Sequence, residues 1–290
     1  MSPASPEPEW LRDSPLRPCV LWLEQQAFEI ARRDPPLADD KLYLNDHGSR
    51  HIQAVVGFAE QLMGRTFIPS FSDIEKATLY AAALTHDLGL FRFPDGLDSL
   101  EVRATHARLS GAWVRDQLGH GYLTEDFARV LAITIESHAR SVDITTVPSF
   151  ARIPESPQLL RPRLLVAMLR IADSLDMGQS RTPIAIYRYY EGRIPARSAP
   201  YWAAHQLIND AELDLERREV LLHLKYGTDP ADPDLRMLYT ALQSEFDAIP
   251  DELWEVNRCV RLHVVFTEGD RRLAPGKVYA DLVDRERARD

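Results

Sequence analysis

The chain carries Thr85-His86-Asp87-Leu88-Gly89 directly after an apolar run from Ala77 to Leu84 that reads Ala-Thr-Leu-Tyr-Ala-Ala-Ala-Leu. The run predicts a buried helix, and Gly89 is typical of a residue that ends one. An imidazole and a carboxylate therefore arrive next to each other at the end of a core helix. Neighbours on a helix diverge by about 100°, so these two side chains do not share a protein partner, but both can reach one ion placed off the helix end.

The composition is that of a globular protein, with 290 residues of which 45% are hydrophobic. This length fits one large domain, or one domain with a smaller appendage. The net charge of -10 argues against general binding of nucleic acids or anionic membranes, because such binding leaves a basic footprint.

Cellular location is indicated by three negative observations. No apolar run approaches the roughly 18 residues that span a bilayer, and the N-terminal residues lack the pattern of a signal peptide. The two cysteines, Cys19 and Cys259, fit no CxxC pattern. We therefore expect a cytoplasmic protein without a membrane partner.

Apolar residues recur at helical spacing through the first two thirds of the chain. Ser72, with Glu75 three residues later, predicts a capping box at the start of the helix that leads to His86. Together these segments predict an all-helical domain, with helices over about 16–33, 52–62, 73–86, 104–118, 125–137 and 163–176.

The pattern changes after Pro183. Alternating side chains predict a hairpin over 212–215 and 220–224 and a further strand over 259–266. Residues 233–254 between them read as a helix interrupted near Pro250. The predicted fold class is therefore mainly α: a helical domain over 17–183, a small α+β domain over 184–282, a flexible tail over 1–16 and a charged tail over 283–290.

Six potential metal ligands lie on, or at the ends of, the predicted helices of the first domain. Four imidazoles and two carboxylates suit Mn, Fe, Co, Ni or Zn better than Ca or Mg. Six ligands are more than one ion needs while it keeps a position for water, so two divalent ions that share the Asp87 carboxylate fit the count. The six are His51, His86, Asp87, His106, His138 and Asp173.

The order and types of these residues resemble the ligand pattern of the HD superfamily of metal-dependent phosphohydrolases. The resemblance runs from Asp46 to about Pro183. It rests on Asp46-His47-Gly48 with His51, on His86-Asp87-Leu88-Gly89, and on Leu169 to Asp176 followed by Arg181 and Pro183. The last motif is most similar to the branch that also occurs with Hsp90-like ATPase domains.

The resemblance implies an HD-type helical bundle and assigns roles to the ligands. His51, His86, Asp87 and Asp173 match the residues that hold the metal in mononuclear members. His106 and His138 match the two further histidines that hold the second metal in binuclear members. The implied activity is hydrolysis of a phosphoester or phosphoanhydride bond, in a nucleotide or related small molecule, by a metal-activated water.

Substrate-binding residues follow from their proximity to the ligands or the motifs. Asp87 would hold both metals and orient the water, which makes it the candidate catalytic residue. Arg50, Arg140 and Arg181 are candidates for binding phosphoryl oxygens. His47, four residues before His51 on one helix face, is a further candidate for substrate binding or for an outer-shell contact. A homodimer is one option for the quaternary structure.

Departures from the family pattern leave other functions open. Leu90 stands where many members have Lys after His-Asp-x-Gly. The substrate-specific motifs of the cyclic-di-GMP, (p)ppGpp and deoxynucleotide triphosphate branches are absent. One alternative is a metal-binding regulatory or sensor module with little or no catalysis. Another is a metal-dependent nuclease, against which the acidic charge argues.

Overall fold

The structure is a computed structural model in which the described residues divide into two compact units, the first ending at Ser174 and the second beginning at Leu175. The sequence pattern predicts this boundary at residue 183. The described residues are 8–33, 47–64, 71–97, 99–117, 123–152, 159–196, 198–214, 216–217, 219–247 and 263–273. The predicted tail over 283–290 and residues 1–7 lie outside these ranges. No helix within them is long and apolar enough to cross a membrane.

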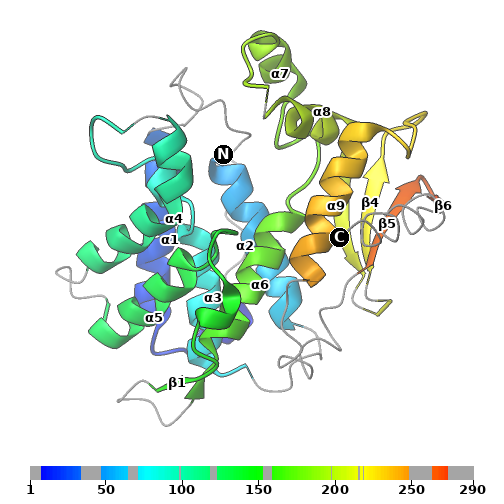
Figure 1. The fold of residues 1–290 in the computed structure, drawn as a ribbon. Helices are drawn as coiled ribbons and strands as arrows, with labels where there is room; N and C mark the ends of the chain where they lie inside the picture. Colours follow the sequence, from blue (N-terminus) through cyan, green and yellow to red (C-terminus); the bar gives the residue numbers. More distant parts are fainter. Residues whose placement is uncertain are drawn as a thin grey trace. The chain divides into compact units, whose positions relative to one another are not determined.

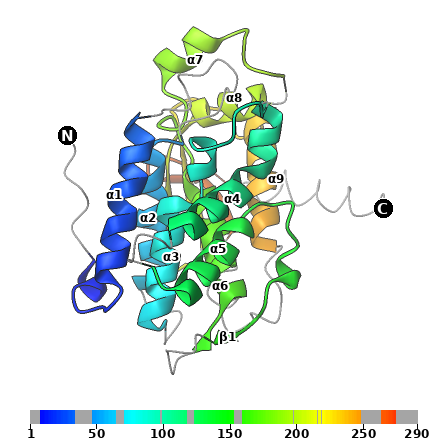
Figure 2. The ribbon, with the colours of Figure 1, turned by 90° about the vertical axis from the view of Figure 1, so that its left-hand side faces the viewer.

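The first unit is a helical bundle around α3, as predicted. Helices α1, α2 and α5 contact α3, and Figure 2 shows α1, α2 and α3 side by side. All residues from Ala77 to Thr85 are buried. The helices of this unit are α1 (Arg17–Arg33), α2 (Ser49–Gly64), α3 (Asp73–Thr85), α4 (Ser99–Asp116), α5 (Glu125–Glu136) and α6 (Pro162–Leu175).

Shorter elements complete the first unit. The 3-10 helix η1 (Glu9–Leu11) lies in the segment expected as a tail, yet Leu11 is fully buried and Trp10 packs edge-on against Tyr80. Two further 3-10 turns follow α3 and α5, and two short strands pair before α6. These are η3 (Leu88–Leu90), η5 (Ile144–Thr146), β1 (Ala151–Arg152) and β2 (Leu159–Leu160).

The predicted capping box forms and joins α3 to α6. Ser72 Oγ accepts the amide of Glu75, and Glu75 Oε2 accepts the amide of Ser72. The buried Glu75 carboxylate also accepts the amide and guanidinium of Arg161, directly before α6. At a rise of about 1.5 Å per residue, His86 lies about 17 Å along α3 from Glu75, and Asp173 lies about 18 Å along α6 from Arg161. Because the Glu75–Arg161 contact joins the N-terminal ends of α3 and α6, His86 and Asp173 lie at similar distances from that junction.

The second unit holds a four-stranded sheet of order β3-β4-β5-β6, in which only the middle pair is parallel. Helices α8 and α9 contact each other and the sheet (Figure 1). The strands are β3 (Ile208–Asp214), β4 (Glu219–Leu224), β5 (His263–Glu268) and β6 (Arg271–Leu273), and the helices are α7 (Ile184–Tyr190), α8 (Ala199–Leu207) and α9 (Pro233–Asp247).

Buried and half-exposed side chains alternate along β4, and this alternation is the pattern that predicts a strand. Val220, Leu222 and Leu224 of β4 are buried, while the residues between them are half-exposed. The predicted hairpin is confirmed as β3 and β4. The strand predicted over 259–266 is confirmed from His263 onward as β5, and residues 259–262 lie outside the described residues. The sequence pattern does not predict α7, α8 or β6. The part of the predicted helix beyond Asp247 lies outside the described residues.

Candidate metal centre

Five helical segments of the first unit bring the six predicted ligands together. His51 lies in α2 and His106 in α4, whereas His86 is the C-terminal cap of α3 and Asp87 follows it. The remaining two ligands are His138, two residues beyond α5, and Asp173 in the last turn of α6.

The expectation that Gly89 ends the helix is wrong. Helix α3 ends at Thr85 with His86 in a right-handed conformation, and Gly89 is not among the glycines with positive φ. Glycine is needed for packing instead. A β carbon at residue 89 would lie 2.7 Å from Leu109 Cβ and 2.9 Å from the amide nitrogen of Ser110. The turn η3 can therefore lie directly on α4.

One oxygen of Asp87 belongs to a group of three histidines and a second carboxylate. Asp87 Oδ2 lies 3.3 Å from Nε2 of both His51 and His86. Oδ1 of Asp173 lies 3.3 Å from His51 Nε2 and 3.7 Å from His86 Nε2. The two Nε2 atoms are 3.2 Å apart. His47 Nδ1 also contacts Asp87 Oδ2, at 2.7 Å.

The other oxygen of Asp87 faces two further histidines. Oδ1 lies 3.4 Å from His106 Nε2 and 3.9 Å from His138 Nε2, and these nitrogens are 3.2 Å apart. The rings of His86 and His138 meet edge to face with centroids 5.1 Å apart. Asp87 therefore stands between two adjacent groups of nitrogen atoms.

Backbone carbonyls fix the tautomers of three of these histidines. Nδ1 of His86, His106 and His138 contacts the carbonyl oxygen three residues earlier, at 3.0, 2.7 and 2.6 Å respectively. A carbonyl only accepts, so Nδ1 carries a proton and donates it. In the neutral ring Nε2 then bears a lone pair. Metal-binding histidines are oriented in this way.

This donor set fits metal ions. When both rings are neutral, the Nε2 atoms of His106 and His138 have no proton to share, so their close approach is repulsive unless a cation lies between them. For a metal bond of about 2.1 Å, neighbouring ligand atoms are about 3.0–3.4 Å apart. Most separations within each group lie in this range. Clustered His and Asp side chains of this kind can bind metal ions.

The carboxylates also control the charge of the cluster without metal. Burial acts to lower the pKa of His86, but Asp87 and Asp173 outweigh it and raise that pKa to about 10. Burial also acts to raise the pKa of Asp87, but His86 and His47 hold it well below its usual range. Burial, with the charges of His86 and His106, lowers the pKa of His138 to about 4. A proton on His86 thus supplies positive charge that the carboxylates stabilise.

Solvent reaches the cluster along one edge. The side chains of His51, His86 and His138 are buried, whereas that of His106 is 21% exposed and that of Asp173 is 33% exposed. The edge marked by His106 and Asp173 is where a ligand could approach.

The predicted substrate-binding residues differ in their surroundings. Arg50 and Arg140 are exposed, the first adjacent to His51 and the second two residues beyond His138. Arg181 belongs to the second unit, is buried, and donates to Asp176 through Nη1 at 3.2 Å. A role for any of them in substrate binding stays a prediction.

Two residues beside the ligands were missed in the sequence. Ser110 accepts the amide of Gly89 and donates to the carbonyl of His106. Arg170 is buried and donates to backbone carbonyls around His138. The available signal was a hydroxyl four residues after His106 and a cation that follows the apolar run Leu164 to Leu169 in α6.

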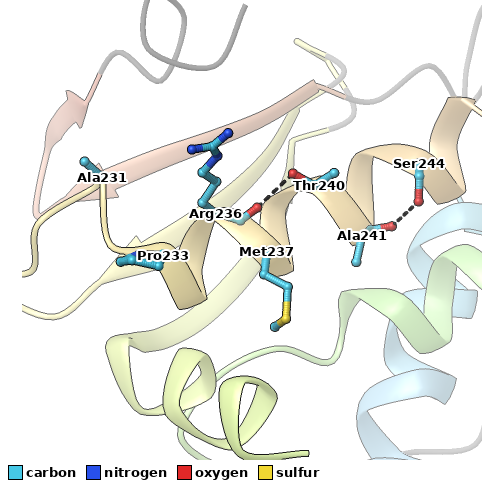
Figure 3. Close-up of a pocket in the computed structure, with 7 residues that line it drawn as sticks. All are labelled: Ala231, Pro233, Arg236, Met237, Thr240, Ala241 and Ser244. Carbon is cyan, nitrogen blue, oxygen red and sulfur yellow. Dashed lines mark hydrogen bonds between the residues drawn. The ribbon is translucent and has the colours of Figure 1, made fainter. Parts of the chain in front are cut away.

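A pocket of about 550 Å³ lies elsewhere, along α9 in the second unit (Figure 3). The hydroxyl groups of Thr240 and Ser244 donate to carbonyls of their own helix, those of Arg236 and Ala241. Its lining contains no carboxylate, imidazole or thiol. The chemistry of hydrolysis or metal binding is therefore sought at the histidine cluster.

Comparison with known proteins agrees with that choice. The sequence profile of the family HD-CE matches residues 40–254, a range that contains the whole cluster. No curated protein matches the chain.

Proposed function

The chain belongs to the HD-CE family, and on that premise we propose that it is a metal-dependent phosphohydrolase. Its substrate would be a phosphoester or phosphoanhydride of a nucleotide or related small molecule. The similarity of its last motif to the branch found with Hsp90-like ATPase domains is part of this proposal.

One observation carries the proposal. The two oxygens of Asp87 face separate pairs of imidazole nitrogens, His51 with His86 and His106 with His138, and each pair is 3.2 Å apart. A single carboxylate between two such pairs is the arrangement expected of a bridge between two metals. His51, His86 and Asp173 would share one metal with Oδ2, and His106 and His138 would share the other with Oδ1.

Nitrogen-rich ligands favour Mn, Fe, Co, Ni or Zn. When bound, such ions lower the pKa of a water molecule and neutralise charge on phosphoryl oxygens. The chain's own residues would do the rest. Asp87 orients the attacking water, the carbonyl bonds of the histidines hold their rings in place, and the exposed edge at His106 and Asp173 admits the phosphate.

Exposed positive side chains close in sequence to the cluster residues would complete phosphate binding. Arg50 and Arg140 are exposed next to ligand-bearing segments, and guanidinium groups match phosphoryl oxygens in geometry. His47 already donates to Asp87 and would hold that carboxylate in its bridging orientation. The buried Arg181 pairs with Asp176, which favours a structural role in the second unit.

One feature favours a second candidate function, a metal-binding regulatory module. Leu90 is buried in η3, at the position where many family members carry Lys. A buried leucine cannot contact a phosphate. A protein that binds two metals but turns over no phosphoester would support this candidate.

The test is hydrolysis by protein reconstituted with each of the five metals. Substrates would be nucleotides and bis(p-nitrophenyl) phosphate. We expect Asp87→Asn to lower turnover by about 100-fold or more. Asp126→Asn, which changes a carboxylate paired with Arg129 on α5, should retain activity. Hydrolysis that persists in Asp87→Asn would show that the activity comes from elsewhere and would defeat the proposal.

A further inference from the structure

We propose that Arg170 positions His138 for the second metal by holding the turn that follows α5. The inference rests on the proposed function, because it requires a second metal at His138. Arg170 is a positioning residue in this account and does not contact the metal or the substrate.

His138 is held differently from the ligands inside helices. Helix α5 ends at Glu136, so His138 lies in a turn where the regular helical hydrogen bonds have stopped. Its amide donates to the carbonyl of Ile135, and its Nδ1 donates to the same carbonyl. By contrast, His106 lies in the middle of α4. The position of His138 therefore depends on what fixes the turn.

Arg170 contacts the backbone on both sides of His138. Its Nη2 lies 2.8 Å from the carbonyl oxygen of Ser137 and 2.9 Å from that of Ala139. The same atom lies 2.6 Å from the carbonyl oxygen of Val142, and Nε lies 3.2 Å from that of Ser137. One guanidinium thus joins three carbonyls of the turn.

Physical chemistry makes this contact hard to replace. A buried guanidinium is costly unless its donors are paired, and Arg170 is only 9% exposed. The carbonyls at a helix C-terminus carry the negative end of the helix dipole and are suitable partners. The planar, delocalised guanidinium presents several donors in a fixed geometry, whereas a lysine ammonium acts as a point charge. Loss of Arg170 would leave the turn free to move.

The same helix links both halves of the cluster. Arg170 precedes Asp173 by three residues in α6, so the two lie on neighbouring positions of one helix surface. Asp173 faces His51 and His86, while Arg170 reaches the turn of His138. Helix α6 therefore fixes the position of the His138 turn relative to the first group of ligands.

Arg163 offers a matched control on the same helix, two turns earlier. Its Nε donates to the carbonyl of Val147 at 2.9 Å, and its Nη2 donates to that of Thr145 at 2.7 Å. The chemistry is the same, but these carbonyls belong to η5 and the residue after it. Arg163→Met removes an arginine brace without touching the turn of His138.

The experiment measures binding of Co²⁺ by calorimetry and by its visible absorption spectrum, which gives a readout independent of activity. We expect Arg170→Met to weaken the second Co²⁺ by about 10- to 100-fold, the usual effect of losing an outer-shell contact. Binding of the first Co²⁺ should change little. Arg163→Met should leave both affinities as in the wild type, although it lowers the melting temperature.

A double-mutant cycle decides whether Arg170 acts through His138. In a His138→Ala background, titrated at Co²⁺ concentrations high enough to fill the weakened second site, Arg170→Met should cause no further loss of affinity for the second Co²⁺. A further loss as large as that in the wild-type background would overturn the inference. Equal weakening of both ions, or equal effects of Arg170→Met and Arg163→Met, would overturn it as well.

A second variant and the stoichiometry of the wild type distinguish the possible outcomes. If Arg170→Met does not fold, Arg170→Lys retains the charge but lacks the planar group, so it should weaken the second Co²⁺ selectively; unchanged affinity refutes the inference. Wild-type protein that binds one Co²⁺ would overturn both the two-metal function and this inference. Two ions in the wild type, with unchanged binding in the Arg170 variants, would overturn the inference alone.

Discussion

Gly89 and Ser110 are joined by a 2.8 Å hydrogen bond in which the glycine amide donates to the serine hydroxyl. The hydroxyl donates in turn to the carbonyl of His106 at 2.9 Å. The turn that follows Asp87 is thereby connected to the backbone of a ligand on another helix. The spacing between Asp87 and His106 is set by this contact and by the absence of a side chain at residue 89.

We therefore expect Gly89→Ala to disturb the position of Asp87 relative to His106. The new methyl group would collide with Leu109 and Ser110 and push η3 away from α4. Overpacking of this kind costs about 1–3 kcal/mol of unfolding free energy. The affinity for the second metal should fall at the same time. Gly57→Ala in α2, where an added β carbon meets nothing within 4 Å, should leave metal binding unchanged and not lower stability. Chemical denaturation and metal titration of both variants provide the check.

Metal stoichiometry tests how the ligands are divided. His106→Ala removes a nitrogen near Asp87 Oδ1, so bound metal should fall from two ions per chain to about one. His223→Ala changes a histidine of β4 that contacts Glu212 and Thr267, and it should retain both ions. Elemental analysis of protein purified without chelators measures the difference. Two ions in His106→Ala would contradict the assignment.

The pKa of His86 predicts how metal binding depends on pH. Because this pKa is about 10 without metal, His86 is protonated at neutral pH, and a metal that occupies Nε2 must displace a proton. Apparent affinity should therefore rise with pH, by up to about tenfold per unit below pH 10. Calorimetry in two buffers of different ionisation enthalpy should show about one proton released. Binding of the first metal without proton release would contradict the prediction.

The same shift has a consequence for stability. The folded-state pKa of His86 lies above its ordinary value of 6.5, so its protonation stabilises the metal-free fold fully below pH 6.5. This contribution is lost as pH rises towards 10. We expect the melting temperature of metal-free protein to fall as pH rises from 6.5 to 10. The melting temperature of metal-loaded protein should not show this fall. Melting curves of both forms across this range test the expectation.

The residues of the histidine cluster could be located from the sequence because their chemistry and their helices leave separate signals. Helical spacing predicted the bundle, and imidazoles at the ends of apolar runs, such as His86 and His138, marked one region. The residues that hold the backbone beside this cluster, Arg170 and Ser110, could not be located in this way. Arg170 and Ser110 bind backbone carbonyls, which every residue possesses, so no partner side chain appears in the sequence to indicate the contact.

The second unit was harder to predict for a different reason. Buried and half-exposed residues alternate along all six residues of β4, which is long enough for the pattern to be recognised, whereas β3 alternates only near its end, around Leu213. Strand β6 has three residues, and α7 has seven in a segment rich in aromatic side chains. Elements of this length are specified by tertiary packing, such as the stacking of Tyr187 on Trp202, more than by periodicity.

Glu75 is predicted to be a main contributor to the stability of the helical unit. Its carboxylate is almost fully buried and accepts the amide of Ser72 together with the amide and guanidinium of Arg161. Glu75→Gln would leave the charge of Arg161 without its buried partner, and we expect a loss of about 3 kcal/mol in unfolding free energy. Lys76→Gln removes an exposed pair with Asp73 on the same helix and should cost about 0.5 kcal/mol or less. Urea denaturation compares the two. Equal losses would mean that the junction of α3 and α6 is held by apolar packing, and that the levels of His86 and Asp173 are set without Glu75.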